Sequence, residues 1–504
     1  MIKILKSLLT LNSSIMRNNY SINWLIPQLD RSKCSRQIEE FIIREIRSRN
    51  LHAGDPVPSS RQLAKINQVS ASSVRRAYVK LTDNNWLTSN PGSGTVVSAN
   101  NPTEDMQRRT SGFTEHFPAG LVLLNKKQEI YQPAYVEEPY IAVGTDFPSP
   151  AAFPENKFSE YCNHFREESR KLSQARLLNE YDARYLKDNL VNYLNRRRGF
   201  GLKNNMLDII KARKSALDRV FKILISPGDV VINTSPHDTK LSDALLKCNA
   251  NVFTINRKDP DFMDRIAQLL SHTKVRAIHI RPQCSIPESF TLDEDSCRRL
   301  VQLAKDHRMC IIEEEDDHEF WYGITAYKPL ACYDHDGYVI YMAALSKATS
   351  DTQSLRIIVA SAQFITELQA LPAQAINERD VIKEKAFAEM ILKGDMADYA
   401  RQVRIQSKTY RDELNLILNH YLNKFISYVI PEHGLTYWLK FDEGFDLNVM
   451  LKKLDDNGIP VPYHPNNQKT SIKTNFMVLG FGAFDINEAE GGAKMLGMVM
   501  SGNL

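Results

Sequence analysis

Six short apolar segments rich in Val and Ile recur through the middle of the chain, and they constrain the fold more than any other feature. They read DVVINT (229–234), NVFTINR (251–257), VRAIHIRP (275–282), MCIIEEE (309–315), YVIYMAAL (338–345) and RIIVAS (356–361). Helical stretches such as TLDEDSCRRLVQLAKDH lie between them. This alternation is typical of a parallel sheet with crossover helices, so the sequence predicts a large α/β body.

Charged residues follow three of these predicted strands. A run of five acidic residues spans 313–317, Lys347 comes soon after the segment YVIYMAAL, and Arg356 opens the next strand. Because functional groups in such sheets lie at the carboxyl ends of the strands, we expect these side chains to lie near one another. A lysine, a carboxylate and an arginine can supply the Schiff base, the pyridine-nitrogen partner and the phosphate partner of pyridoxal 5'-phosphate. An exposed acidic loop with ordinary charged turns is the alternative that spacing alone leaves open.

Residues 33–97 carry a different pattern. An amphipathic helix with Ile38, Phe41, Ile42 and Ile46 on one side is followed by two shorter helical segments, SSRQLAKI and ASSVRRAYVKLTDNN. Ser70 is placed to cap the second of these. The segment from Trp86 to Val97 then predicts two strands joined by a Pro-Gly turn.

This order of elements is that of a winged helix-turn-helix. In such a motif the first turns of the recognition helix face DNA, and here they offer Ser72, Ser73, Arg75 and Arg76. The charge agrees, because residues 1–99 contain 14 Lys and Arg against 6 Asp and Glu, a net charge of +8 in a chain whose total is +4. A basic segment on a faintly acidic body indicates a polyanionic partner for that segment alone.

The run GDPVPSSRQLAKINQVSASSVRRAYVKLTDNNWLTSNPGSGTVV resembles the DNA-binding domain of the GntR family of bacterial transcriptional regulators almost continuously. In that family the matching arginines and wing residues contact DNA. The resemblance therefore implies DNA contacts for Arg61, Arg75, Gly94 and Thr95.

The body resembles the fold-type I aminotransferase domain that follows this DNA-binding domain in the MocR/GabR group. The matching segments occur in the same order, and they are GTDFPSPAAFP, YLKDNLVNYLNRRRGF, SPGDVV, CIIEEEDDHEFWY, YMAALSK and EMILKGDMADYARQVRIQSKTYRDEL. The resemblance implies that Lys347 forms the Schiff base with pyridoxal 5'-phosphate and that Arg356 pairs with its phosphate. Glu314 matches the pyridine-nitrogen aspartate, and Asp316 stands where a tyrosine normally meets the phenolic oxygen of the cofactor.

Several departures from the family pattern affect this site. Two more residues than usual separate Lys347 from Arg356, residues 211–214 (KARK) replace a Ser-Gly-Ala-Gln phosphate cradle, and Asp238 replaces a tyrosine. Between Gly201 and Gly323 the only glycine is Gly228. No arginine follows Arg411, although fold-type I transaminases hold the substrate carboxylate with an arginine near the C-terminus. Lys473 is no equivalent for such a bidentate clamp, so we expect no transaminase turnover and assign no catalytic residue.

The predicted organisation combines an α+β winged helix-turn-helix head with an α/β fold-type I body and a C-terminal α+β subdomain. The predicted ranges are a tail at 1–30, the head at 31–98, a linker at 99–140, the large domain at 141–395 and the small subdomain at 396–504. The seven cysteines are scattered without zinc-site spacing, and no apolar run reaches the roughly 20 residues of a membrane span. We expect a homodimer in the bacterial cytoplasm without a metal site.

Three hypotheses follow. The leading one is a regulator that binds double-stranded operator DNA and senses a small-molecule effector through pyridoxal 5'-phosphate on Lys347. The second is an active aminotransferase with a vestigial DNA-binding head. The third is a regulator whose body has lost the cofactor and serves as a dimerisation scaffold.

Overall fold

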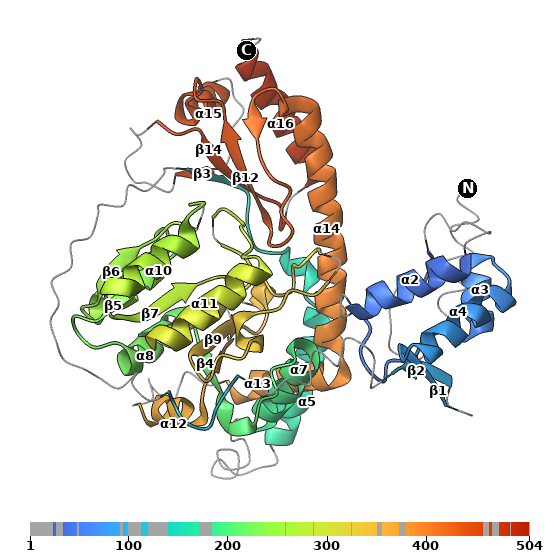
Figure 1. Cartoon of the computed structure of the whole chain (residues 1–504). Coiled ribbons are helices and arrows are strands. Elements are labelled where there is room, and N and C mark those ends of the chain that lie inside the picture. The colour runs from blue at the N-terminus through green and yellow to red at the C-terminus, as the bar shows by residue number, and fades with distance from the viewer. Residues whose placement is uncertain are drawn as a thin grey trace. The chain divides into compact units, whose positions relative to one another are not determined.

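The computed structural model describes residues 24–26, 34–47, 50–90, 94–98, 112–118, 140–170, 184–257, 259–285, 287–323, 325–349, 355–371, 380–456, 463–465, 473–483 and 485–502. The chain divides into two compact units (Figure 1). The smaller unit contains residues 1–109 with 324–326 and 390–401, and the larger unit contains the remainder. Most of the predicted linker at 99–140 and the turn of the predicted wing at 91–93 lie outside the described residues.

The smaller unit contains the predicted helix-turn-helix and wing. Its elements are α2 (Cys34–Arg47), α3 (Ser60–Asn67), α4 (Ala71–Asp83), β1 (Leu87–Asn90) and β2 (Gly94–Val97). The two strands pair antiparallel, with Leu87 opposite Val97. The apolar stripe predicted for the first helix is confirmed, because Ile38, Phe41, Ile42 and Ile46 are all buried in the core of this unit.

Side-chain caps set the start of both short helices. Ser59 and Gln62 form a reciprocal capping box at α3, and the side chain of Ser70 accepts a hydrogen bond from the backbone N–H of Ser73 at α4. The hydroxyl of Tyr78 donates to the backbone oxygen of Pro58, at 2.6 Å. This bond ties α4 to the loop that precedes α3, so the two helices of the motif hold a fixed relation.

A seven-stranded sheet forms the centre of the larger unit. Its strand order is β4-β10-β9-β8-β7-β5-β6. The bounds are β4 (Leu207–Lys211), β5 (Val230–Asn233), β6 (Asn251–Thr254), β7 (Val275–Ile280), β8 (Cys310–Glu315), β9 (Val339–Ala344) and β10 (Leu355–Val359). The strands are parallel except that β10 is antiparallel to both β4 and β9. The six predicted strands are therefore confirmed as β5 to β10, whereas the sequence analysis did not predict β4.

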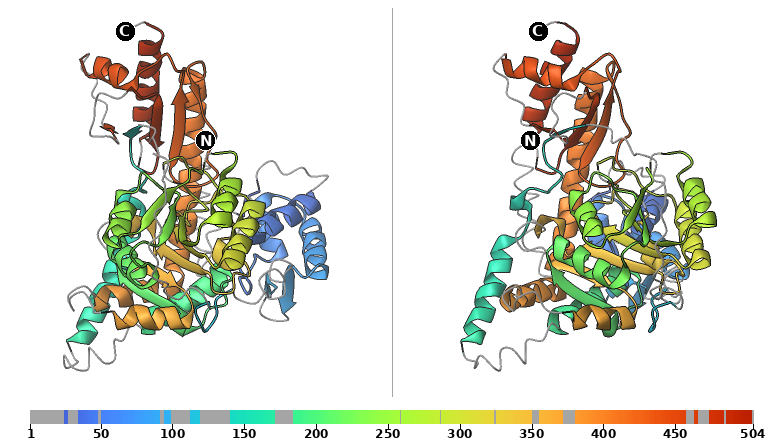
Figure 2. Two further views of the ribbon diagram at one scale, coloured as in Figure 1. Left: turned by 60° about the vertical axis from the view of Figure 1, so that its left-hand side comes forward. Right: turned by 90° about the vertical axis from the view of Figure 1, so that its left-hand side faces the viewer.

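Helices connect and cover the strands of this sheet (Figure 2). They are α8 (Arg213–Leu224), α9 (Thr239–Lys247), α10 (Phe262–His272), α11 (Glu294–His307) and α12 (Ala362–Ala370). The remaining helices that precede the C-terminal sheet are α5 (Glu155–Ser169), α7 (Arg184–Arg198), α13 (Val381–Lys393) and α14 (Asp395–Leu422). In the described part of the chain, no helix is both long enough and apolar enough to cross a membrane.

A second sheet contains the C-terminal strands in the order β11-β12-β14-β3-β13. Its strands are β11 (Ile426–Ser427), β12 (Thr436–Phe441), β13 (Tyr463–Pro465), β14 (Phe476–Gly480) and β3 (Ile141–Val143), accompanied by α15 (Leu447–Asp456) and α16 (Ile486–Met500). Strand β3 precedes the central sheet in the chain but pairs parallel to β14. The segment 141–143 therefore belongs to the C-terminal sheet, not to the large domain in which the sequence analysis placed it.

His335, just before β9, makes the folding stability of the larger unit depend on pH. Its ring is fully buried, lies 4.6 Å from the ring of Phe113, and accepts a hydrogen bond from the backbone N–H of Val339 at Nδ1. Burial lowers the pKa of His335 to about 3. The unfolded chain therefore binds a proton near the ordinary histidine pKa of about 6.5 that the folded chain does not bind.

The stability that this histidine contributes is present above that ordinary value and is lost as the pH falls toward 3. We expect the melting temperature to fall more steeply below about pH 6.5 in the wild type than in His335→Leu, because leucine has no proton to gain. Thermal melts of both proteins over this pH range measure the difference. Parallel curves would show that His335 does not titrate on unfolding.

Candidate DNA interface and cofactor-like site

The smaller unit has a groove between the start of α3, the exposed side of α4 and the wing strands. Its volume is about 570 Å³, and its lining includes Ser59, Arg75, Val79, Gly94 and Thr95. The hydroxyls of Thr95 and Ser89 lie 3.2 Å apart across the two wing strands. Gly94 has φ of +93°, a conformation that favours glycine, and it begins the second wing strand. The fold therefore brings three of the predicted DNA contacts, Arg75, Gly94 and Thr95, to one surface.

The other predicted DNA contacts separate into exposed and buried side chains. Arg61, Ser72 and Arg76 are exposed, and they do not line the groove itself. Ser73 is only 7% exposed, and its hydroxyl lies 2.8 Å from that of Ser70 and accepts from Arg76. The expectation that Ser73 faces DNA is therefore wrong in this structure, because its side chain points toward Ser70, the residue that caps α4.

This difference predicts unequal effects for two neighbouring serines. Ser73→Ala removes the hydroxyl partner of Ser70 and is expected to lower the stability of the smaller unit by about 1 kcal/mol. The Ser72 hydroxyl also lies 3.0 Å from that of Ser70, but it is exposed, so water can take its place in Ser72→Ala and stability should stay within about 0.5 kcal/mol of the wild type. Thermal melts check both values. Equal loss of stability in the two variants would contradict the internal role of Ser73.

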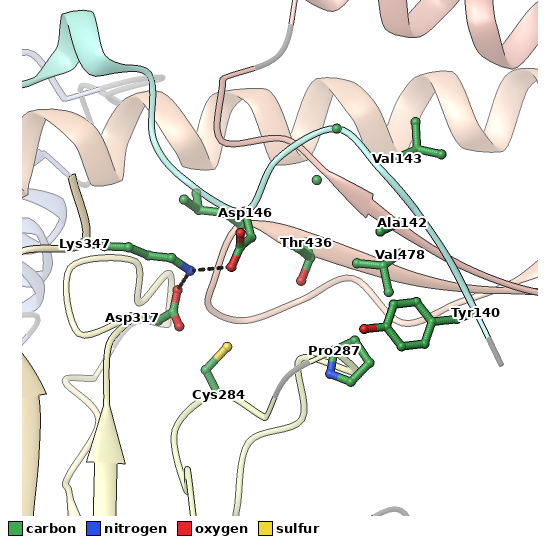
Figure 3. A pocket seen from close by; sticks show the side chains of 13 residues that line it. Tyr140, Ala142, Val143, Asp146, Cys284, Pro287, Asp317, Lys347, Thr436 and Val478 are labelled. Atoms are coloured by element: carbon green, nitrogen blue, oxygen red, sulfur yellow. Dashed lines mark hydrogen bonds and ion pairs between the residues drawn. The ribbon is translucent and has the colours of Figure 1, made fainter. Parts of the chain in front are cut away.

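Lys347 follows soon after the end of β9 at Ala344, as the sequence predicts, and faces two carboxylates (Figure 3). Its Nζ is 2.5 Å from Oδ1 of Asp317 and 3.3 Å from Oδ2 of Asp146, and the side chain is 5% exposed. These three residues line a pocket of about 180 Å³ with Cys284, Thr436 and Tyr140 among the other lining residues. Neither Asp317 nor Asp146 was predicted from the sequence as a partner of this lysine.

The two carboxylates hold the proton on Lys347. Burial by itself would lower the pKa of Lys347, but Asp146 and Asp317 raise it above its ordinary value. Burial raises the pKa of Asp317, against the opposing effect of the lysine. A lysine must lose its proton before its nitrogen can attack a carbonyl, so this arrangement opposes that chemistry.

Glu314 is the centre of a separate buried ion network. Both of its carboxylate oxygens accept hydrogen bonds from Arg213, and one oxygen is also 3.1 Å from Arg281 and 3.0 Å from the ring of His279. Arg213 also pairs through both terminal nitrogens with Asp238. Arg213 and Arg281 hold the pKa of Glu314 well below its ordinary value, although burial acts to raise it. Glu314 therefore stays ionised within the fold.

Arg356, on β10, pairs with Asp316, so its guanidinium is already occupied by a protein carboxylate. Arg356 donates to Asp316, and its Nη1 lies 3.7 Å from Oε1 of Glu314. Burial acts to raise the pKa of Asp316, but Arg356 lowers it overall. The structure thus brings the predicted residues Glu314, Asp316 and Arg356 together, while Lys347 contacts a different carboxylate, Asp317.

The remaining acidic residues of this region have local partners. Glu313 accepts hydrogen bonds from the backbone N–H groups of Leu330 and Ala331, both at 2.8 Å. Glu315 pairs with Arg198 and accepts a hydrogen bond from Tyr341. The acidic run therefore does not form an exposed loop, and the described residues contain no group of three His, Cys, Asp or Glu side chains arranged to hold a metal.

These side chains do not fit pyridoxal 5'-phosphate. The predicted ring-nitrogen partner Glu314 and the predicted phosphate partner Arg356 are both engaged by other protein groups. Four cationic side chains (Lys347, Arg213, Arg281 and Arg356) face five carboxylates (Asp146, Asp238, Glu314, Asp316 and Asp317), so each of these four cations is already paired with a carboxylate. The pocket at Lys347, at about 180 Å³, is also smaller than the roughly 300–1,000 Å³ of typical small-molecule sites.

Comparison with known proteins separates the chain into the same two parts. Residues 34–97 match the family model "Bacterial regulatory proteins, gntR family". The chain is 22% identical over 472 residues to an uncharacterized HTH-type transcriptional regulator, YdfD, of Bacillus subtilis, covering 92% of this chain and 96% of that one. It is also 22% identical over 430 residues to the probable rhizopine catabolism regulatory protein MocR of Rhizobium meliloti, covering 84% and 85%.

The body is similar in fold to solved aminotransferases. The crystal structure of kynurenine aminotransferase from Pyrococcus horikoshii matches with a TM-score of 0.59 at 20% identity, covering 72% of this chain and 91% of that one. These matches confirm the predicted fold class and favour a regulator over an enzyme. The chain joins a GntR-type helix-turn-helix domain to a fold-type I aminotransferase-like body, which is the organisation of GntR-family transcriptional regulators with an aminotransferase-like domain.

Proposed function

We propose that this protein binds operator DNA through the smaller unit and regulates transcription in response to a small molecule that binds its aminotransferase-like body. One observation carries the DNA-binding part of the proposal. Arg75 lines the groove that the recognition helix α4 shares with the wing residues Gly94 and Thr95. Arginine in this position can read guanine edges or pair with phosphates in the major groove.

The proposed DNA contacts follow from exposure and position. Arg75, Gly94 and Thr95 border the groove, and Arg61, Ser72 and Arg76 are exposed nearby on α3 and α4. Ser73 is left out of this set because it is buried. A cationic recognition surface of this kind gives binding that weakens as salt is added.

The proposed assembly is a homodimer in the bacterial cytoplasm. Two helix-turn-helix units then contact two half-sites, and an effector that changes the relation between them alters DNA affinity. In this arrangement residues 31–98 act as the DNA-binding domain, 99–140 as the linker and 141–504 as the sensing body. Sedimentation analysis of the full chain, with and without DNA, checks the dimer.

The likeness to pyridoxal-phosphate enzymes is the reason to expect that cofactor on Lys347, with Glu314, Asp316 and Arg356 around it. The ion pairs of these residues weigh against it, so the proposed regulator does not depend on the cofactor. Transaminase activity has less support. No arginine follows Arg411, and the side chain of Arg411 itself is already bound to other protein groups. Arg411 donates to Asp412 and to the backbone oxygen of Pro431, at 2.9 Å.

Selection from a random-sequence DNA library by the full chain tests the proposed function. We expect recovery of one motif with two half-sites about 10 base pairs or a multiple of that distance apart, as two-fold symmetric helix-turn-helix dimers require. The recovered site is then placed in a promoter that drives a reporter gene. Recovery of unrelated sequences, or a reporter that does not respond to the protein, would contradict a regulator.

A further inference from the structure

We propose that Arg213 takes the place of the cofactor in this body, so that a network of protein side chains holds together the strand ends that pyridoxal 5'-phosphate would otherwise join. The inference concerns the larger unit alone and does not rest on DNA binding. It explains why the strand-end residues Glu314, Asp316 and Arg356 come together while none of them is available to a ligand.

The position of Arg213 is the first step. Strand β4 ends at Lys211, and helix α8 begins at Arg213, so this is the strand-to-helix turn in which the resemblance places a phosphate cradle. Such a helix start, lined with backbone N–H groups, would favour an anion. Here Ala212 has φ of +65°, uncommon for a residue other than glycine, and the next side chain, Arg213, reaches the carboxylates of Glu314 and Asp238.

Arg213, at the start of α8, connects that helix to strand β8 and to helix α9. It contacts Glu314 on β8 and Asp238, whose side chain also caps α9 by accepting from the backbone N–H of Leu241 at 3.1 Å. The Arg213 side chain is 11% exposed and that of Glu314 is 0% exposed, so the pair lies largely away from solvent. A ring nitrogen that approached Glu314 would have to displace Arg213 from both carboxylates.

Arg281 reinforces the same network from the end of β7. Its Nη2 lies 3.1 Å from Oε2 of Glu314 and 3.2 Å from Oδ2 of Asp238, and its side chain is 7% exposed. Two arginines therefore share two carboxylates, which leaves neither a free cation nor a free anion at this point. Removing one partner of a buried pair of this kind is strongly destabilising, so the network resists replacement by a ligand.

The positive charge that would hold the phosphate is neutralised by a carboxylate in a similar way. Arg356 is 5% exposed at its side chain and donates to Asp316. The lysine-rich turn adds no buried cation, since Lys211 and Lys214 are both exposed. A phosphate dianion would have to separate Arg356 from Asp316 and leave that carboxylate, which is only 14% exposed, without its arginine partner.

The experiment adds excess pyridoxal 5'-phosphate to the purified full chain and records absorbance before and after borohydride, followed by peptide mass spectrometry. Lys347→Ala serves as the matched control, because it separates an adduct on Lys347 from chance modification of surface lysines. We expect no adduct on Lys347, the same surface adducts in both proteins, and a melting temperature that the cofactor does not change. A stoichiometric borohydride-trapped adduct on Lys347, with a raised melting temperature, would overturn the inference.

Failure of this inference is distinguishable from failure of the proposed function. Binding of the full chain to the selected DNA is measured separately, and it does not require an empty or a filled cofactor site. A protein that traps the cofactor and still binds its operator would keep the regulator and lose only the role assigned to Arg213.

Discussion

The double variant Arg75→Ala, Arg76→Ala is expected to lose most of its affinity for the selected operator. Both side chains are exposed on α4, and Arg75 lines the groove beside the wing. Removing an arginine that reads a base edge costs about 1–3 kcal/mol, and loss of a phosphate contact also weakens binding. Each such base contact is therefore worth roughly 5- to 150-fold in affinity.

Fluorescence anisotropy with a labelled operator duplex measures this loss at several salt concentrations. Arg36→Ala is the control, because Arg36 is exposed on α2 in the same unit and pairs with Glu40, at 2.8 Å, outside the groove. The single variants Arg75→Ala and Arg36→Ala remove the same charge, so their difference isolates the contribution of position. Equal effects of these two changes would show that the recognition surface is not the one assigned to α4.

Arg213→Met is expected to destabilise the larger unit more than any surface substitution. The change leaves Arg281 as the arginine that contacts both Glu314 and Asp238, with Arg356 3.7 Å from Glu314, while Glu314 stays fully buried. Removing one partner of a buried ion pair typically costs about 3–5 kcal/mol, which is a large part of the stability of an ordinary domain. The double variant Arg213→Met, Glu314→Gln lacks one of the two carboxylate charges and should recover part of the stability that Arg213→Met loses.

Thermal melts followed by circular dichroism check this series. Lys247→Met is the matched control, because Lys247 pairs with Asp218 at 2.7 Å but is 52% exposed at its side chain. An exposed pair is worth at most about 1 kcal/mol, so the control should melt close to the wild type. Melting temperatures that fall equally in Arg213→Met and Lys247→Met would show that the buried network does not support the fold.

The sequence predicted those parts of the fold whose signal is local. Strands β7, β8 and β9 are buried along their whole length, which gives the continuous apolar runs that stand out in the sequence. The five residues of β4 give a weaker signal, and a short apolar run can equally begin a helix. Strand β3 could not be assigned to its sheet, because its partner β14 lies more than three hundred residues later and no local pattern specifies that pairing.

The sequence predicted which charged residues lie at the site, but it did not predict which of them pair with each other. Lys347 and Arg356 lie near strand ends as expected, since a lysine or arginine after a buried strand is visible in the sequence. Which carboxylate faces the lysine depends on where the chain leaves β8, and that turn brings Asp317, not Glu314, to Nζ. Arg281 and His279 approach Glu314 from the neighbouring strand β7, so only the fold reveals them as its partners.

The central claim is that this chain recognises a particular DNA sequence, and the most direct test compares the affinity of the full chain for the selected duplex and for a scrambled duplex of equal length and composition. At physiological salt we predict at least about 10³-fold tighter binding to the selected duplex, as specific DNA-binding proteins show. Both affinities should fall as salt rises. Equal affinity for the two duplexes at every salt concentration would contradict the account.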